Sequence, residues 1–560
     1  MNKKNNSLSI ALAQTNPIVG DIDKNANIIR DIRNEAAKNE SDIVVFSELN
    51  LSGYPPEDLV LRSAFLDSIE KTVNKLASET SDGGPAIILG APWRNNGDCY
   101  NAALVLDNGK IETIRFKHHL PNYGVFDEER VFNKGPLSGP VSLRGARFAL
   151  MICEDMWFSD VSETALESGA EILIVINGSP FELNKSDSRL SHAVARVSET
   201  QKPLIYINQV GGQDDLVFDG GSFILNSDCS LALQTSWWET KIIFSNWTKF
   251  QDTWICDKGN IEKNNSKLES IYNAMVLGLK DYVSKNNFPG VVIGLSGGID
   301  SALTAAVAVD ALGSENVLCV MMPSPYTSKE SLYDAKVFAD NFNVKIENID
   351  ISDSFKTLKN SLSSLFKNKV EDLTEENMQS RIRGLILMSL SNKFGYMVLT
   401  TGNKSEVSVG YATLYGDMCG GYSVLKDIYK TTVTDLCVWR NKNKILNSLG
   451  PNGDVIPNRI ITKPPTAELR LNQKDEDSLP PYNILDAILK GLIEEQMSIT
   501  SLQELGYDIE IVKFVWKLLR NSEYKRRQAA PGVKISNIAF GRDHRYPITQ
   551  AYNGDKIKKI

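Results

Sequence analysis

The chain has 560 residues, of which 42% are hydrophobic and 23% are charged. This is the composition of an ordinary globular protein, so a disordered chain and a collagen-like repeat are excluded. At about 150 residues per domain, the length predicts roughly three or four domains, or two large ones. Sixty-one basic residues against sixty-nine acidic ones give a net charge of −8, so bulk charge does not hold this protein on nucleic acid or on an anionic membrane.

Apolar stretches are all shorter than the roughly 18 residues that a membrane-spanning helix needs. The apolar run near the N-terminus is also too short for a secretory signal, and it predicts a first buried strand at Ser9–Ala13. The seven cysteines include no C-x-x-C pair. Such scattered thiols are typical of a reducing compartment, so we expect a cytoplasmic protein. The four histidines form no H-x-x-x-H or H-E-x-x-H motif, which argues against a zinc enzyme.

Short β-rich apolar runs dominate the first part of the chain, and helix-type stretches such as 24–39 and 188–200 separate several of them. Strands that alternate with helices or with one another predict a layered α/β or α+β domain. From 246 to 267 the composition changes to Asn, Lys, Glu, Ser and Asp, which indicates a boundary. We therefore predict one domain at 1–250, a linker at 251–267 and a second domain at 268–560.

The second part opens with apolar residues at helical spacing from Leu268 to Tyr282 and then alternates strands with helices. Helices are predicted at 301–312 and 329–342. Strands are predicted for VVIGL, NVLCVMM, VKIENIDI and YMVLTT. Regular alternation of this kind predicts a doubly wound parallel sheet. The polar, Pro-containing segment Pro464–Pro481 is expected to be an ordered surface loop.

The sharpest motif is SGGIDS, Ser296–Ser301, which lies between a predicted strand and a predicted helix. Paired glycines let the backbone turn tightly and aim N–H groups at an anion, and the helix that follows adds its positive N-terminus. The motif has no Walker lysine, and an ordinary Gly-rich turn is the alternative interpretation. We predict a phosphate-binding loop formed by Gly294, Leu295, Ser296, Gly297, Gly298, Ile299, Asp300 and Ser301.

Two further segments are candidates for the same site. Thr401 and Glu406, in TGNKSE, follow a predicted strand at the edge of the sheet where ligands bind, although a capped helix start would explain them equally well. A basic cluster near the C-terminus predicts either a phosphate clamp or a solvated tail. It comprises Lys525, Arg526, Arg527, Lys534, Arg542 and Arg545.

These motifs resemble known families. SGGIDS is similar to the SGGxDS loop of the ATP pyrophosphatases, which cut ATP between its α and β phosphates. The segments TGNKSEVSVGYATLYGD, ENMQSRIRG, KPPTAELRLNQKDEDSLPPY and KRRQAAPG resemble the NAD synthetases, and the similarity covers most of 268–550. One departure stands at His544, where GRDHRYPI replaces the usual GRDRRYPI, so a permanent charge is lost.

This resemblance implies a Rossmann-like ATP-pyrophosphatase domain that joins ammonia to deamido-NAD through an adenylated carboxylate. It implies that Thr401 contacts ATP, and that Asp300 and Glu406 meet Mg²⁺. It also implies a deamido-NAD site formed by Asn377, Glu406 and Lys525.

In the first part, Cys153 ends an apolar run, Glu48 also ends a predicted strand, and Lys117 lies in the polar stretch KHHLPNYGVFDEER. A buried structural cysteine and two exposed charges are the alternative interpretation. The chemistry nevertheless fits an amidase. A neighbouring cation lowers a thiol pKa, a carboxylate can take the thiol proton, and a lysine can stabilise an oxyanion.

Together the three residues resemble the nitrilase superfamily over roughly residues 5–245, which implies an α-β-β-α sandwich with Glu48, Lys117 and Cys153 as its catalytic residues. The resemblance also implies a second glutamate, for which Glu128 is the candidate. It further implies a glutamine-binding set of Tyr123, Ser179 and Lys185.

A nitrilase-like amidase fused to an NAD-synthetase-like domain implies an ATP-dependent ligase of the glutamine-dependent NAD synthetase family. Its small-molecule substrates are deamido-NAD, ATP and L-glutamine or ammonia, and we expect a homo-oligomer with no nucleic-acid or membrane partner. A tRNA-modifying ATP pyrophosphatase fed by the same amidase is an alternative, which the lack of a basic excess and of a C-x-x-C pair disfavours. A non-catalytic scaffold is a second alternative, which the complete set of motifs disfavours.

Overall fold

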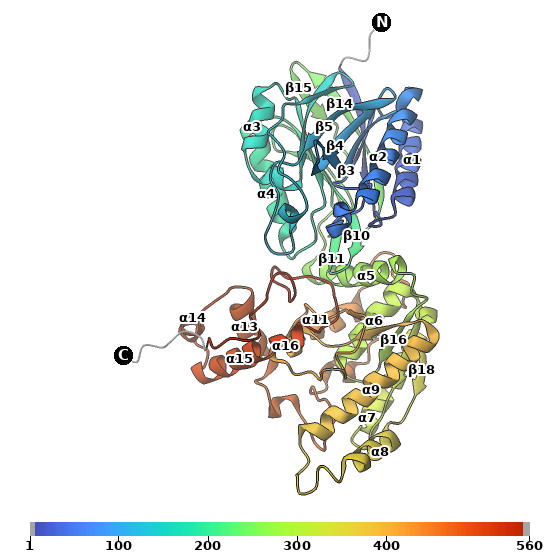
Figure 1. Ribbon diagram of the computed structural model, residues 1–560, viewed down its shortest axis with the longest axis vertical. Helices are drawn as coiled ribbons and strands as arrows, with labels where there is room; N and C mark the ends of the chain where they lie inside the picture. The colour runs from blue at the N-terminus through green and yellow to red at the C-terminus, as the bar shows by residue number, and fades with distance from the viewer. Residues whose placement is uncertain (1–5, 553–560) are drawn as a thin grey trace. The chain divides into compact units, whose positions relative to one another are not determined.

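The structure, a computed structural model, describes residues 6–552 and divides into two compact units, one ending at Asn265 and the other beginning at Ser266 (Figure 1). Among the described residues, no helix is long and apolar enough to cross a membrane. The two units have different sheets and separate cores.

Two sheets and a hairpin make up the strands of the first unit. The first sheet has the spatial order β15 (Thr253–Cys256), β14 (Lys241–Phe250), β1 (Ser7–Gln14), β2 (Ile43–Phe46), β3 (Ala86–Asn95), β4 (Asp98–Asp107) and β5 (Lys110–Phe116). The second has the order β13 (Leu231–Gln234), β12 (Phe223–Leu225), β9 (Leu204–Asn208), β8 (Ile172–Asn177), β7 (Ala146–Ile152) and β6 (Val141–Leu143). β10 (Val210–Gln213) and β11 (Leu216–Asp219) form a separate hairpin.

The central strands of both sheets are apolar on both faces, which is the pattern of strands covered on each side. In β8, Ile172 and Ile174 belong to the core shared with Ile10 and Ile43 of the first sheet. Leu173, which points to the opposite face, belongs to the core that includes residues of the outer helices. Side chains therefore fill three layers, one between the sheets and one beneath each pair of helices.

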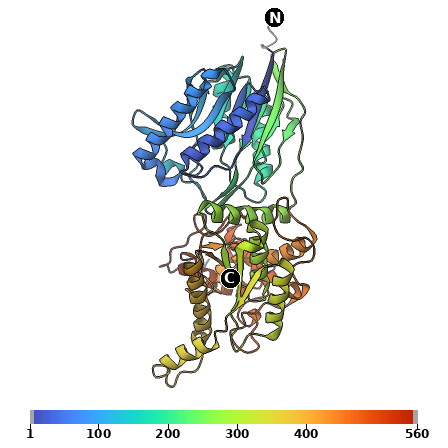
Figure 2. The ribbon, with the colours of Figure 1, turned by 90° about the vertical axis from the view of Figure 1, so that its right-hand side faces the viewer.

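Helices cover the outer faces of the two sheets (Figures 1 and 2). The helices are α1 (Ile22–Lys38) and α2 (Ser63–Glu79) on the first sheet, and α3 (Asp160–Glu167) and α4 (Lys185–Thr200) on the second. Asp21 caps α1 by accepting a hydrogen bond from the Lys24 amide at 3.1 Å. The α-β-β-α sandwich implied by the sequence is thus confirmed.

The predicted linker at 251–267 is partly strand. β15 pairs antiparallel with β14, and Trp254 and Cys256 bury their side chains in the core between the sheets. The polar residues around this strand hide its short alternation of buried and outward-facing positions, T-W-I-C. The first sheet therefore continues to Cys256.

The second unit contains a parallel sheet with the order β18 (Lys345–Asn348), β17 (Val317–Met321), β16 (Val291–Gly294), β19 (Met397–Thr400) and β20 (Tyr422–Ser423). The chain starts at the central strand, builds one side, and then returns to build the other. This order confirms the doubly wound sheet and places a switch point next to β16, outside whose carboxyl end ligands bind.

The helices of this unit are α5 (Lys267–Lys285), α6 (Ile299–Leu312), α7 (Lys329–Phe342), α8 (Ser352–Leu362), α9 (Leu373–Phe394), α10 (Lys404–Val409), α11 (Lys430–Lys442), α12 (Asn458–Thr462), α13 (Tyr482–Ile493), α14 (Ile499–Glu504), α15 (Ile509–Asn521) and α16 (Glu523–Arg526). α7 has the predicted bounds, and α6 begins two residues before the predicted start. α6 is apolar almost all round and is buried along its length, as expected of a central helix.

A buried ion pair ties three of these helices together. Arg440 of α11 donates to both carboxylate oxygens of Asp310 in α6, at 2.6 and 2.9 Å, and the Tyr272 hydroxyl of α5 donates to the same carboxylate at 2.6 Å. Removing either charge would leave the other buried and unpaired, at a cost of about 3–5 kcal/mol. The ion pair therefore fixes α6, which follows the SGGIDS loop, to α5 and α11.

Candidate active sites

The three candidate catalytic residues of the first unit each follow a strand: Glu48 follows β2, Lys117 follows β5 and Cys153 follows β7. Lys117 Nζ lies 2.7 Å from Glu48 Oε1, and neither side chain has any exposed surface. Cys153 is only 5% exposed. The predicted Glu–Lys–Cys set thus converges at the strand ends of the first unit.

Close backbone contacts position Glu48. The amide of Gly178 donates to Glu48 Oε2 at 2.7 Å, and Asn101 Nδ2 donates to Oε1 at 2.7 Å. Gly90 of β3 faces the same segment, where a Cβ atom would lie 2.3 Å from the Leu49 amide nitrogen. Only glycine therefore allows β3 to approach the turn that carries Glu48.

Cys153 begins a tight turn after β7 with φ of +47°, a left-handed conformation that is strained for a residue with a side chain. Burial raises the pKa of its thiol well above the usual value, and the Glu48 carboxylate adds to the rise while Lys117 opposes it. Lys117 does lower the thiol pKa as expected, but burial and the Glu48 carboxylate outweigh it, so the net shift of the Cys153 pKa is upward. A buried neutral thiol needs a base when it attacks, and Glu48 is the neighbouring carboxylate.

Glu128 belongs to the same network. Its Oε1 accepts hydrogen bonds from Lys117 Nζ at 2.8 Å and from the Tyr54 hydroxyl at 2.9 Å. Burial raises the pKa of Glu128 to about 7; Lys117 opposes this rise and Glu48 adds to it. Burial disfavours the Lys117 ammonium too, but the two glutamates outweigh it and raise the lysine pKa. Lys117 therefore remains a cation between two acidic groups.

The three expected glutamine-binding residues, Tyr123, Ser179 and Lys185, each make contacts that relate them to the segments around this centre. Tyr123 is 54% exposed, and its hydroxyl donates to Glu154, the neighbour of Cys153, at 2.9 Å. Tyr123 also packs edge-on against Phe126, whose ring has Lys185 Nζ at 5.3 Å. Ser179 is buried, and its hydroxyl accepts from Arg189 at 3.1 Å.

Asp155 is a residue that the sequence interpretation missed. Its Oδ1 accepts from the amides of His118 and His119 at 3.0 and 2.8 Å, and its Oδ2 accepts from the Ile152 amide at 3.0 Å. This buried carboxylate thus connects the segment after Lys117 with the turn that presents Cys153. Its place two residues after the cysteine was the only available signal.

In the second unit, a pocket of about 310 Å³ opens at the carboxyl end of β16. Its lining includes the whole predicted loop Gly294–Ser301, together with Thr401 and Glu406. The segment 463–469 also lines it, so the predicted surface loop at 464–481 forms part of a pocket wall. The predicted loop, Thr401 and Glu406 therefore line one pocket at the switch point of the sheet.

The SGGIDS loop has the conformation that an anion-binding turn requires. Gly297 has φ of +79°, and a Cβ atom there would lie 2.3 Å from the Ser331 carbonyl oxygen. The Ser296 hydroxyl accepts from the Gly298 amide at 3.2 Å and lies 3.0 Å from the Ser301 hydroxyl. α6 begins at Ile299, so its N-terminal amides face the same region.

Lys430, at the start of α11, joins the two acidic residues expected to meet Mg²⁺. Its Nζ pairs with Asp300 and lies 3.3 Å from Glu406 Oε1. Burial raises the pKa of Glu406 to about 8; Lys430 opposes the rise, while Asp300 and Asp475 add to it. Carboxyl oxygens are the ligands that a hard divalent cation prefers, and a bound cation would favour the ionised form of Glu406.

The expected deamido-NAD residues Asn377 and Lys525 do not line this pocket. Lys525 Nζ donates to the carbonyls of Gly410 and Ala412 at 2.7 and 2.6 Å. Asn377 Oδ1 accepts from the Thr413 hydroxyl at 2.8 Å. Both side chains therefore hold the segment 410–413, of which Tyr411 and Ala412 reach the pocket.

In the C-terminal basic cluster Arg526 and Lys534 are buried, whereas the other arginines are exposed. Arg526 is buried, pairs with Glu523 at 2.9 Å and donates to the Ser408 carbonyl at 2.7 Å. Lys534 is buried against Asp543 at 2.6 Å. Burial and the nearby Arg526 lower the pKa of His544 to about 4, so the ring is neutral. These charges pack the C-terminal segment onto the unit.

Two cations that line this pocket also escaped the sequence interpretation. Lys463 pairs with Glu468 at 3.0 Å, and Arg383 donates to the Met322 carbonyl at 3.0 Å. Burial lowers the pKa of Arg383 to about 10, so it is charged near neutral pH. Both line the pocket and could face phosphate oxygens.

Comparisons with known proteins assign a family to each part of the chain. Residues 9–247 match the carbon-nitrogen hydrolase family, and residues 271–529 match the NAD synthase family. The chain is 46% identical over 543 residues to a glutamine-dependent NAD(+) synthetase of Rhodobacter capsulatus, covering 97% of this chain and 98% of that protein. It is 44% identical over 557 residues to one from Xanthomonas campestris pv. campestris, covering 98% of each.

A solved structure is similar over the same extent. It is a glutamine-dependent NAD+ synthetase from Acinetobacter baumannii in complex with adenosine diphosphate. The two chains are 40% identical with a TM-score of 0.78, and the match covers 97% of this chain and 98% of that one.

Proposed function

The chain belongs to the family of glutamine-dependent NAD(+) synthetases, and we propose that it converts deamido-NAD, ATP, L-glutamine and water into NAD, AMP, pyrophosphate and L-glutamate. One observation carries the proposal. The same chain holds a buried Glu48–Lys117 pair, at 2.7 Å, beside Cys153 and an SGGIDS loop lining a pocket at a sheet switch point.

In the first unit, Glu48 takes the thiol proton while Cys153 Sγ attacks the side-chain amide carbon of glutamine. The oxyanion that develops is stabilised by the Lys117 ammonium. Glu48 then returns the proton to the leaving nitrogen, the C–N bond breaks, and ammonia and a glutamyl thioester form. A water molecule, deprotonated by Glu48, hydrolyses the thioester to glutamate and restores the thiol.

Tyr123, Ser179 and Lys185 are the residues we assign to glutamine recognition. Support comes from the Tyr123–Glu154 hydrogen bond and from the Phe126 ring shared by Tyr123 and Lys185. The polar groups would hold the charged α-amino and α-carboxyl groups of the amino acid, so that its amide reaches Cys153.

In the second unit, ATP lies on the Gly294–Ser301 loop with Thr401 beside it. The deamido-NAD carboxylate attacks the α-phosphorus, pyrophosphate leaves, and an acyl adenylate forms. Ammonia then attacks the acyl carbon, AMP leaves with the electrons of the C–O bond, and the nitrogen releases one proton to solvent to give the amide. Asp300 and Glu406 would hold Mg²⁺, which supplies charge neutralisation for the phosphate oxygens. Asn377 and Lys525 support the deamido-NAD site, together with Glu406.

Glutamine is a suitable nitrogen source because unprotonated ammonia is the nucleophile, whereas free ammonia near neutral pH is mostly ammonium. Ammonia released in the first unit is used in the second before it equilibrates with water. We further propose that the protein works in the cytoplasm, which accords with seven cysteines that form no disulfide. We also propose that it forms a homo-oligomer.

Covalent labelling with a glutamine analogue, 6-diazo-5-oxo-L-norleucine, tests the first site. We expect mass spectrometry to find the label on Cys153 alone, and glutamine-driven NAD formation to stop while ammonium-driven formation continues. Cys419, which lines the nucleotide pocket, serves as the internal control. A label on other cysteines, or loss of both activities, would contradict the proposal.

A further inference from the structure

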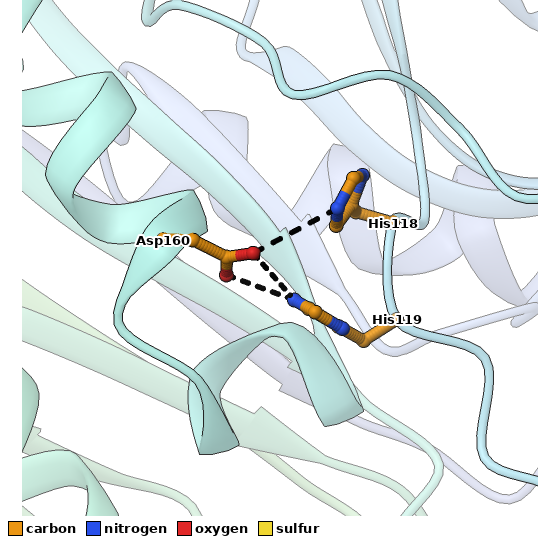
Figure 3. A group of neighbouring side chains, drawn as sticks. All are labelled: His118, His119 and Asp160. Atoms are coloured by element: carbon orange, nitrogen blue, oxygen red, sulfur yellow. Dashed lines mark hydrogen bonds and ion pairs between the residues drawn. The ribbon is translucent and has the colours of Figure 1, made fainter.

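Beside the glutaminase centre, three side chains from two segments of the chain point toward one another: His118, His119 and Asp160 (Figure 3). Each residue offers one ligand atom, and these three atoms lie within 4.8 Å of one another. Among the described residues, no other group of His, Cys, Asp and Glu side chains is this compact. The proposed glutamine chemistry uses none of the three.

The orientation of His118 leaves an unfilled gap. Its Nδ1 lies 2.7 Å from the Gly135 carbonyl oxygen, which can only accept, so Nδ1 carries the proton. In a neutral ring, Nε2 then presents a lone pair. This nitrogen lies 3.8 Å from Asp160 Oδ2, too far for a hydrogen bond. Two acceptors that face each other at this distance leave room for a cation between them.

The remaining ligands complete the arrangement. His119 Nε2 lies 2.8 and 3.0 Å from the two oxygens of Asp160, and the His119 ring stacks on Phe158 with ring centroids 4.1 Å apart. The contact from His118 Nδ1 to a carbonyl is the outer contact that metal-bound histidines usually make. The Asp155 carboxylate already fixes both histidine backbones, so the two rings are held in place before an ion arrives.

The exposure of the group suits an exchangeable ion. The side chains of His118, His119 and Asp160 are 14%, 18% and 44% exposed, so water can reach them and can complete the coordination shell. Two imidazoles and one carboxylate are the ligand set of borderline first-row ions, whereas Mg²⁺ and Ca²⁺ prefer oxygen ligands alone.

We propose that His118, His119 and Asp160 bind one divalent ion of the zinc class, and that the ion ties the segment after Lys117 to the segment after Cys153. Binding replaces the His119–Asp160 hydrogen bond, and the single proton of the neutral His119 ring moves from Nε2 to Nδ1 through water, so that Nε2 offers its lone pair to the ion. Because Lys117 directly precedes His118 and α3 begins at Asp160, the ion would stiffen both segments next to the glutaminase centre.

The test uses the full-length chain with Cys153→Ala, so that the nucleophilic thiol cannot bind metal. Co²⁺ is titrated by calorimetry and by visible absorption in an excess of Mg²⁺, which occupies the oxygen-ligand site proposed at Asp300 and Glu406. We expect one ion per chain with d–d bands and no thiolate-to-cobalt charge-transfer band. His119→Gln and Asp160→Asn should each weaken Co²⁺ binding by about tenfold or more. Hydrogen exchange should slow at 117–119 and at 158–161 when the ion binds.

His192→Gln is the matched control, because this histidine lies in the same unit but packs against the Trp157 ring, outside the group. It should bind Co²⁺ as tightly as the parent. Circular dichroism and melting without metal establish that each variant folds, and two ligand variants are used so that one misfolded protein does not decide the result. No binding to the parent, binding through thiolates, or equal binding by both ligand variants would overturn the proposal.

Discussion

The pKa of Glu128 gives a quantitative test of the buried charge network around Lys117. Burial raises this pKa from its ordinary 4.5 to about 7, against the attraction of Lys117. A carboxyl with a raised pKa binds its proton more tightly in the folded chain than in the unfolded chain. The free energy of unfolding therefore falls as the pH rises from about 4.5 to about 7, and the loss is complete above that range.

Glu128→Gln removes the titration but keeps an oxygen that can accept from Lys117 Nζ and from the Tyr54 hydroxyl. At about 1.4 kcal/mol for each tenfold change in proton affinity, the rise from 4.5 to about 7 corresponds to about 3 kcal/mol at most. The amide nitrogen cannot accept a hydrogen bond, which offsets part of the gain. We expect the variant to be more stable than wild type by about 2 kcal/mol at pH 8.5 and nearly equal at pH 4.5.

Urea unfolding followed by tryptophan fluorescence at several pH values measures this difference, because six of the eight tryptophans precede residue 266. Glu129→Gln is the matched control, since Glu129 is the exposed neighbour and should show no such pH dependence. An equal stability difference at both pH values, or a wild type that is the more stable at pH 8.5, would refute the charge network as described.

Three further changes test other parts of the account. Asp155→Asn weakens the charge-assisted hydrogen bonds to the backbone around Lys117 and Cys153. Glutamine-driven NAD formation should therefore fall about tenfold or more while ammonium-driven formation is unchanged. An equal fall in both reactions would contradict this role. Gly297→Ala places a Cβ 2.3 Å from the Ser331 carbonyl oxygen, so it should reduce ATP affinity and NAD formation with either nitrogen donor. Gly298→Ala is the control and should have a far smaller effect, because the nearest atom to its Cβ is the Ser296 hydroxyl oxygen at 3.2 Å. Lys430→Met leaves Asp300 and Glu406 without their cation, which should lower the stability of the second unit by about 3–5 kcal/mol. Melting curves should show that Mg²⁺ restores part of that loss, and an Mg²⁺ effect no larger than in wild type would argue against the metal assignment.

Local motifs explain most of what the sequence predicted. SGGIDS combines its chemistry with the strand and helix that flank it, so six contiguous residues indicated both the pocket and its place on the sheet. α7 had the predicted bounds because its apolar residues keep a regular helical spacing between clear turns. The Glu48, Lys117 and Cys153 set came from resemblance, since no local pattern relates residues so far apart.

The sequence concealed interactions between distant residues. Lys430 pairs with Asp300 across 130 positions, and nothing in YKTTV distinguishes it from an ordinary exposed lysine. The histidine group was missed because adjacent His118 and His119 meet Asp160 through tertiary folding, not through a spaced histidine motif. The strand at Thr253–Cys256 was missed because two buried side chains carry little weight within a polar stretch.

The most direct test of the account measures NAD formation from deamido-NAD, ATP and Mg²⁺, by wild type and by Cys153→Ala, with either glutamine or ammonium as the nitrogen source. The account predicts that wild type uses both donors, and that the variant loses the glutamine reaction but keeps the ammonium reaction. Failure of wild type with ammonium, or glutamine-driven NAD formation by Cys153→Ala, would contradict it.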